Sequence, residues 1–168
     1  HGFTPATILE DTPITFSLPG LPSYTPRNYD EAYRGKIPLR SALAESRNIP
    51  AVKVLVSYGV SEMLKMGNFM GITTWKDPSD YGLSLTLGGG EVKLIDLADA
   101  YATVANYGKK PEFFSITKVP NYKGKVLEEN KCNKARRFNT AQAAFEEQST
   151  CQNQPVLDPR VAYLLIDI

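Results

Sequence analysis

Two polar side chains, Ser46 and Asn48, have the types and the spacing in this sequence that best suit chemistry. In a non-helical connection, side chains two residues apart point to the same side of the backbone. We therefore expect the hydroxyl and the carboxamide to point into one cavity, with Arg47 turned away. A serine hydroxyl acts as a nucleophile at neutral pH only with a base and a proton relay beside it. The pair alone does not make a site, and the alternative is structural: Ser46 would merely end its helix and Asn48 would satisfy turn backbone.

Two predicted helices, at about residues 39–46 and 50–58, place this pair at the elbow between them. The first helix has an apolar stripe at positions i, i+3 and i+4, formed by Leu39, Ala42 and Leu43. Pro38 suits a first helical position, where the missing N–H costs nothing. Pro50 predicts a helix boundary, because the residue before a proline is pushed out of the α region.

The rest of the chain is predicted to be mainly helical. Further helices are expected at 61–70, 91–107 and 159–168, and a strand at 112–119 is expected to pair back onto 125–128. The polar residues of 91–107 fall on one face, so we expect that helix to be buried on most of its circumference. Residues 5–35 read as extended pieces and turns, and residues 72–90 as an irregular connection ending in three glycines.

Composition restricts the class of protein. The 168 residues, 42% hydrophobic and 22% charged, suit one globular domain. A net charge of +1 gives no field that favours nucleic acid or an anionic membrane, and the basic run at 131–137 reads as a solvated loop. We see no membrane span and no signal peptide. The single histidine, His1, and the scattered acids Asp30, Glu31 and Asp80 predict no metal site and no cofactor.

Both cysteines, Cys132 and Cys151, fall in residues 129–157, which we expect to be loop with a short helix at about 140–147. A disulfide between them would stabilise a segment with little core of its own, by about 3 kcal/mol for a loop of roughly 20 residues. It would also indicate an oxidising compartment such as a periplasm. Two unpaired thiols are the alternative.

Three blocks of sequence carry a family resemblance. They are YTPRNYDEAY with RG and IPLR at 24–40, ALAESRNIPAVK at 42–53, and GLSLTLGGGEV at 82–92 with DLA and YA at 96–102. In order and spacing they resemble the class A penicillin-binding proteins, and Ser46-Arg47-Asn48 resembles the Ser-x-Asn motif of their transpeptidase domain. The resemblance covers about residues 1–119 and 156–168.

The resemblance implies an α/β (α+β) serine transpeptidase fold of the β-lactamase-like type, of which this segment is mostly the helical lobe. Residues 1–168 would be an internal part of one such domain, and 129–157 a variable loop insertion. Most of the central antiparallel sheet would lie outside the segment. An apolar face would then be exposed, and the segment made alone would dimerise, aggregate or need its missing parts.

The implied activity is peptidoglycan D,D-transpeptidation, which cross-links stem peptides through an acyl-serine intermediate that β-lactams also form. By position, Ser46 would be the proton relay and Asn48 the amide clamp. The implied partners are stem peptides, β-lactam antibiotics and the remaining parts of the domain. The full-length protein would lie on the periplasmic face of the bacterial inner membrane, held by an N-terminal anchor outside this chain.

Two motifs of that family do not carry over. No Lys-Thr-Gly or Lys-Ser-Gly occurs, and the one Ser-x-x-Lys, at 115–118, falls in a predicted strand and after the Ser-x-Asn block. In a strand, residues three apart point to opposite faces, so we reject it as the nucleophile. We expect the true nucleophile before His1 and the Lys-Thr-Gly strand after Ile168. The chain alone is therefore predicted to form no acyl-enzyme.

Two other classes of function remain open. One is a non-catalytic interaction module with a transpeptidase-like lobe. The other is a phosphate-binding domain that uses the N–H groups of residues 88–90. That glycine run lacks the Lys-Ser/Thr of a P-loop, and Glu91 beside it would repel an anion, so close backbone packing is the favoured interpretation.

Overall fold

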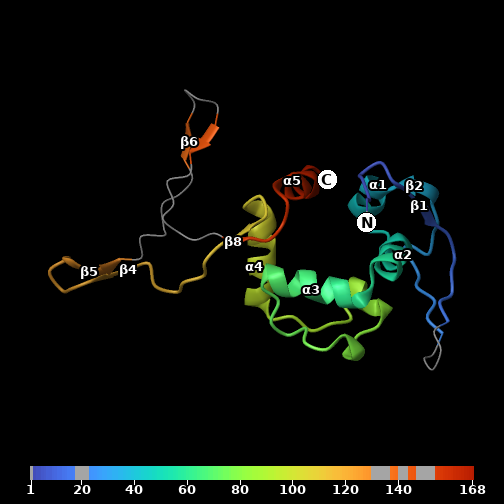
Figure 1. The fold of residues 1–168 in the computed structure, drawn as a ribbon, viewed down its shortest axis with the longest axis horizontal. Coiled ribbons are helices and arrows are strands. Elements are labelled where there is room, and N and C mark those ends of the chain that lie inside the picture. Colours follow the sequence, from blue (N-terminus) through green and yellow to red (C-terminus); the bar gives the residue numbers. More distant parts are fainter. Residues whose placement is uncertain (1, 18–22, 130–136, 140–143, 147–153) are drawn as a thin grey trace.

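Residues 39–105, which include the elbow, are mainly helical. A computed structural model describes residues 2–17, 23–129, 137–139, 144–146 and 154–168. The α-helices of the described residues are α1 (Leu39–Ala44), α2 (Asn48–Tyr58), α3 (Val60–Met70), α4 (Leu94–Ala105) and α5 (Pro159–Asp167). Two 3₁₀ helices, η1 (Pro78–Asp80) and η2 (Leu83–Leu87), lie in the predicted irregular connection. In Figure 1 the helices follow one another along a C-shaped outline from α1 to α5.

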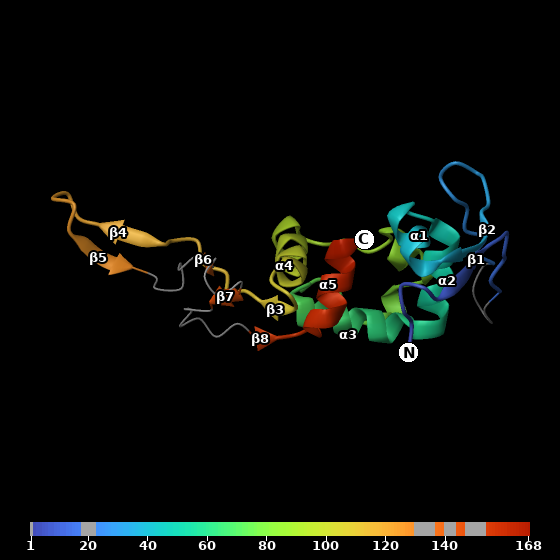
Figure 2. The ribbon, with the colours of Figure 1, turned by 90° about the horizontal axis from the view of Figure 1, so that it is seen from above.

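The strands pair two by two and antiparallel among the described residues. They are β1 (Ile8–Asp11), β2 (Gly35–Pro38), β3 (Lys109–Lys110), β4 (Lys118–Pro120), β5 (Val126–Glu129), β6 (Arg137–Asn139), β7 (Ala144–Glu146) and β8 (Gln154–Pro155). The pairs are β1–β2, β3–β8, β4–β5 and β6–β7. The β4–β5 hairpin lies apart from the helices in both Figure 1 and Figure 2.

The helix boundary predicted at Pro50 lies two residues too late in the sequence. Helix α2 begins at Asn48, so the proline occupies the first turn of that helix. A proline is tolerated there because the N–H that it lacks has no partner within the helix. The elbow between α1 and α2 is therefore only three residues long, 45–47.

The prediction for residues 91–107 was wrong about which face is buried. Helix α4 spans Leu94–Ala105, and its buried residues are Asp96, Ala100 and Thr103. Its apolar stripe is exposed, with Leu94 83% and Tyr101 71% accessible to solvent. The polar face packs because it finds specific partners: Asp96 accepts hydrogen bonds from Thr73 N at 2.7 Å and Thr73 Oγ1 at 2.6 Å.

The predicted strand at 112–119 is shorter than expected. Strand β4 begins only at Lys118, and it pairs with β5 close to the predicted return. The adjacent Phe113 and Phe114 break the alternation that a strand with one buried face needs. Residue 115 therefore belongs to neither a strand nor a helix.

The predicted helix at about 140–147 is also wrong where the structure describes it. Residues 144–146 form strand β7, which pairs with β6. The apolar cluster that suggested a helix is too short to offset the cost of nucleating one. Both Cys132 and Cys151 lie outside the described residues, so their pairing stays a prediction.

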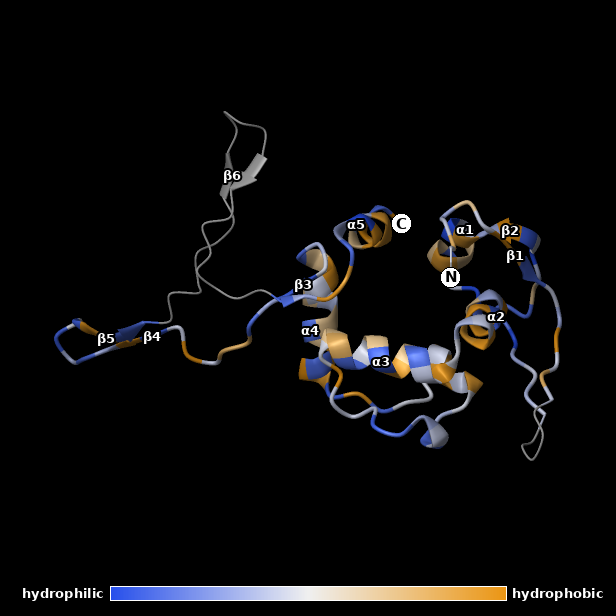
Figure 3. Cartoon of the chain, in the orientation of Figure 1, coloured by the Kyte–Doolittle hydropathy of each residue, from blue (hydrophilic) through white to orange (hydrophobic). Residues whose placement is uncertain are grey.

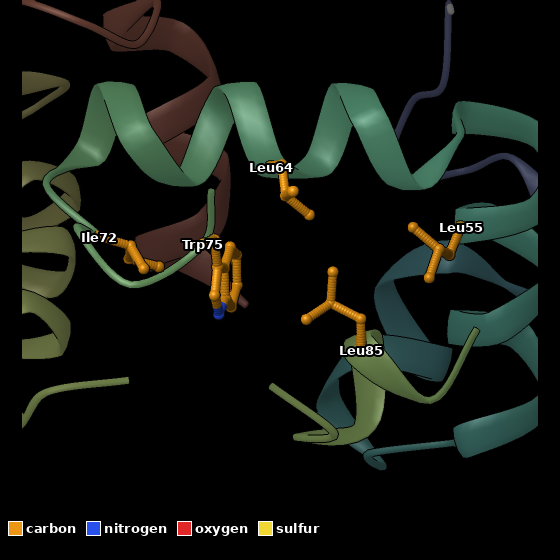
Figure 4. Packing of buried hydrophobic residues seen from close by; sticks show 5 residues of the cluster. All are labelled: Leu55, Leu64, Ile72, Trp75 and Leu85. Atoms are coloured by element: carbon orange, nitrogen blue, oxygen red, sulfur yellow. The ribbon is translucent and has the colours of Figure 1, made fainter. Parts of the chain in front are cut away.

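One hydrophobic core joins α2, α3 and η2. It consists of Leu55, Leu64, Ile72, Trp75 and Leu85, each at most 7% exposed. Figure 4 shows these side chains converging below α3, with the Trp75 ring between Ile72 and the leucines. This core fixes α2, and thereby the position of the elbow at the start of α2.

Apolar side chains are also exposed on the helices. On α5, Val161, Tyr163, Leu165 and Ile166 are 43% to 57% exposed, and Leu43 on α1 is 50% exposed. Hydrophobic positions are accordingly visible on α4, α5 and α1 in Figure 3. Within the described ranges, no helix has the length and apolar character that a membrane crossing requires.

Candidate functional site

Ser46 lies in a tight elbow that ends α1. Its φ of +54° is in the left-handed region, which few residues other than glycine adopt. The backbone N–H of Ser46 donates to Leu43 O at 3.0 Å, and that of Arg47 donates to Ala42 O at 2.9 Å. These bonds satisfy carbonyls at the end of the helix, as left-handed helix ends commonly do. The left-handed residue turns the chain sharply toward α2.

Ser46 and Asn48 both line a cavity of about 600 Å³ at this elbow. Ser46 is exposed and Asn48 half-buried. Most other residues of the lining are apolar: Leu9, Leu39, Ala42, Leu43, Pro50, Ala51, Val54 and Leu87. Such a cavity, apolar with a few polar groups at one point, is the usual form of a small-molecule or peptide site.

Arg47 contributes to the same lining, yet its side chain is only 5% exposed. Its Nε donates to Asp11 Oδ2 and its Nη1 to Asp30 Oδ2, both at 2.9 Å. Its Nη2 donates to the carbonyl oxygen of Ala32. Asp11 is fully buried on β1, and Arg34 N donates to its Oδ2 at 3.0 Å. Arg47 thus ties the elbow to β1 and to residues 27–34, which we call the strap.

The strap also contacts the start of α2. Asn28 Oδ1 accepts hydrogen bonds from Asn48 N at 3.0 Å and from Ile49 N at 3.3 Å, which satisfies two N–H groups of the first turn. The Asn48 side chain donates through Nδ2 to Arg27 O at 2.8 Å. The carboxamide is therefore held by its own hydrogen bond as well as by its backbone.

Arg47 and Asp30 each stabilise the charged form of the other. The hydrogen bond from Arg47, followed by one from the Ala32 backbone, holds the pKa of Asp30 below its ordinary value of 3.8. The same bond, mainly, raises the pKa of Arg47 above its ordinary value. Asp30 lies at the surface as expected, with its side chain 42% exposed, and its pairing with Arg47 adds a structural role that the sequence did not indicate.

Sequence reasoning missed Asp11, Asn28 and Asp30 as parts of the site. Asp11 and Asp30 lie 36 and 17 residues before Arg47, and no local pattern joins them. The one available signal was the arginine itself. An arginine that lies close to a cavity wall needs carboxylate partners if it is buried.

The glycine run serves packing rather than anion binding. The N–H groups of Gly88 and Gly89 donate to Leu85 O and Ser84 O, at 3.1 and 2.9 Å, so neither is free for a phosphate. A Cβ at Gly89 would lie 2.6 Å from Ser84 Oγ, and one at Gly90 would lie 2.5 Å from Leu85 Cδ1. Moreover, α4 begins only at Leu94.

The chain is similar in sequence to several bacterial proteins, although no protein-family model matches it. It is 34% identical over 128 residues to penicillin-binding protein 1A of Rickettsia conorii, covering 76% of this chain and 16% of that protein. It is 32% identical over 172 aligned positions to penicillin-binding protein 1A of Neisseria lactamica, covering 99% of this chain and 19% of that protein. The chain thus spans less than a fifth of the length of these curated relatives.

Solved structures show the same similarity in three dimensions. The crystal structure of penicillin-binding protein 1A from Haemophilus influenzae matches 98% of this chain and 26% of its own, with a TM-score of 0.76 and 25% identity. Penicillin-binding protein A of M. tuberculosis, as a penicillin G acyl-enzyme complex, matches 99% of this chain and 38% of its own. Its TM-score is 0.70 at 20% identity, a likeness of fold alone.

Proposed function

Because this chain belongs to the class A penicillin-binding proteins, we propose that it forms an internal part of a transpeptidase domain in a protein of cell-wall synthesis. Its fold is the α/β fold of those transpeptidases. The observation that carries the proposal is the pairing of Ser46 and Asn48 along one cavity, inside a block similar to the Ser-x-Asn motif of the family.

The proposed reaction of the full-length protein is acyl transfer between stem peptides. A serine outside this chain attacks the carbonyl of the penultimate D-Ala, and the bond to the terminal D-Ala nitrogen breaks. The serine proton passes to that leaving amine, and Ser46 is the relay. An amine of a second stem peptide then attacks the acyl-serine ester, which restores the serine hydroxyl. Asn48 donates to the amide carbonyl of the donor peptide and holds the peptide in place.

Several observations support this assignment of roles. The Ser46 hydroxyl is exposed at the cavity, where a proton donor and acceptor is accessible. The Asn48 amide uses one hydrogen bond to Arg27 O, so its second N–H and its oxygen remain for a ligand. The acyl-enzyme complexes of M. tuberculosis penicillin-binding protein A show a protein of this fold with covalently bound antibiotics.

We also propose the setting of the reaction. The full-length protein acts at the periplasmic face of the bacterial inner membrane, with its anchor outside these residues. Residues 129–157 are a variable loop insertion in that domain. Remaining parts of the domain cover the exposed apolar residues of α4 and α5.

Fluorescent penicillin labelling of the full-length protein tests the proposed roles. We expect Ser46→Ala and Asn48→Ala each to slow the formation of the adduct by about a hundredfold, the loss typical of a single relay or donor. Ser57→Ala is the matched control, because that exposed hydroxyl on α2 donates only to Val54 O in its own helix. Residues 1–168 alone should form no adduct.

Two results would contradict the proposal. One is an adduct on the isolated chain, since the chain would then contain a nucleophile. The other is wild-type labelling by either site variant. A full-length protein that forms no adduct at all would instead favour the non-catalytic interaction module.

A further inference from the structure

Arg47, which lies between the two proposed site residues, is more buried than either Ser46 or Asn48. Arg47 is 5% exposed and reaches three acceptors, two of them carboxylates. We infer that Arg47 is a positioning residue for Asn48, acting through the strap. The inference rests on the proposed function and adds to it a residue whose guanidinium binds β1 and the strap.

A first chain of contacts runs from Arg47 to the backbone of Asn48. Arg47 Nε donates to Asp11 Oδ2 at 2.9 Å, and Asp11 Oδ1 accepts from Asn28 Nδ2 at 2.7 Å. The oxygen of the same Asn28 carboxamide accepts from Asn48 N at 3.0 Å. The Asn28 carboxamide therefore has one allowed orientation. If it were flipped, its oxygen would face the Asp11 carboxylate and its NH₂ group would face the N–H groups of α2, so both hydrogen bonds would be lost. Arg47 fixes Asp11, and Asp11 fixes Asn28.

A second chain of contacts reaches the Asn48 side chain. Arg47 Nη2 and Asn28 Nδ2 both donate to Ala32 O, and these two bonds hold the strap at Ala32. The strap in turn presents Arg27 O to Asn48 Nδ2 at 2.8 Å. That bond holds one amide hydrogen of Asn48, whose side chain belongs to the lining of the cavity.

Only an arginine can make this set of contacts. Its planar guanidinium presents five N–H donors in a fixed fork, whereas a lysine presents one compact ammonium. An ammonium that remained near the buried Asp11 would abandon Asp30 or Ala32 O. Arg47→Lys therefore keeps the charge but loosens the strap, which makes it the informative variant.

The test measures adduct formation by the full-length protein with fluorescent penicillin, in both rate and end point. We expect Arg47→Lys to slow acylation at least about tenfold, since misplacing a reacting group by about 1 Å costs up to 10²-fold. The fraction of protein that labels at long times should stay at the wild-type value. Arg40→Lys is the control, because Arg40 lies on α1 but binds Asp167 on α5 at 2.5 Å instead of the strap.

A double variant shows whether Arg47 acts through Asn48. On an Asn48→Ala background, Arg47→Lys should cause no further loss of rate, because two changes in one chain of contacts are not additive. A lower labelled fraction at an unchanged rate would mean that Arg47 merely supports the fold, and would overturn the inference. So would the full tenfold loss on the Asn48→Ala background. Wild-type labelling by Asn48→Ala itself would instead contradict the proposed function.

Discussion

At the scale of the residue, Ser46 has a backbone conformation that favours glycine and a side-chain hydroxyl that the proposed reaction needs. Its φ of +54° suits glycine, and serine holds it at a cost of roughly 1 kcal/mol. A hydroxyl at a position that would be more stable as glycine indicates that the side chain is retained for a purpose.

This conflict yields a prediction for Ser46→Gly. We expect the variant to be as stable as the wild type or about 1 kcal/mol more stable, because glycine adopts the left-handed region freely. Its adduct formation should be as slow as that of Ser46→Ala. Thermal unfolding and labelling rates, measured on the same preparations of the full-length protein, separate the two effects. A Ser46→Gly variant that labels at the wild-type rate would show that the hydroxyl is not the relay.

Asp30 gives a prediction about pH. Because the Arg47 hydrogen bond lowers its pKa in the folded state, its contribution to stability is complete above its ordinary value of 3.8 and is lost as the pH falls through the lowered value. The melting temperature of the wild type should therefore fall more steeply below about pH 4 than that of Asp30→Asn. Asp80→Asn, a change at an exposed acid of η1, should follow the wild type. Parallel curves for all three proteins would mean that the Arg47 bond does not form.

At the scale of the element, the helices at the elbow were largely predictable. Apolar periodicity located α1, and α2, α3 and α5 lie within two residues of the helices predicted at 50–58, 61–70 and 159–168. These signals are local, so one sequence contains them. The orientation of α4 was not predictable in this way, because the burial of its polar face depends on Thr73, 23 residues away.

Gly67 on helix α3 packs so closely against Trp75 that no side chain fits there. A Cβ at Gly67 would lie 2.7 Å from Trp75 Cε3 and Cζ3. We predict that Gly67→Ala lowers the free energy of unfolding by about 1–2 kcal/mol, since overpacking costs about 1–3 kcal/mol and the gain in helix propensity returns at most about 1.

Gly82→Ala is the matched control for that change. Its Cβ would meet no heavy atom within 4 Å, and its φ of −108° is ordinary for alanine. Urea unfolding of both variants measures the difference. Equal stability of the two would show that Trp75 does not pack against α3 as described.

At the scale of the whole molecule, the exposed apolar residues are the main feature. Leu94, Leu97 and Tyr101 form one stripe along α4, and Tyr163 and Ile166 add to the exposed apolar surface on α5. Contiguous apolar surface of this kind is normally covered. That most of the sheet lies outside these residues stays a prediction, which rests on the family resemblance.

Residues 1–168 produced alone are therefore expected to self-associate. We predict that Leu94→Glu combined with Tyr101→Lys shifts the chain toward the monomer, because it places charges in the α4 stripe. Tyr122→Lys, at a 92% exposed position in the turn of the β4–β5 hairpin, should leave the association unchanged. Sedimentation velocity at several concentrations measures this, and a monomeric wild type at micromolar concentration would contradict the prediction.

The most direct measurement is a crystal structure of the full-length protein acylated by penicillin. We predict that the amide carbonyl of the antibiotic lies about 3 Å from Asn48 Nδ2, a hydrogen-bond distance, with Ser46 Oγ beside the acylated serine. An acyl group bound away from the elbow, with Ser46 and Asn48 making no contact to it or to its serine, would contradict the proposed site.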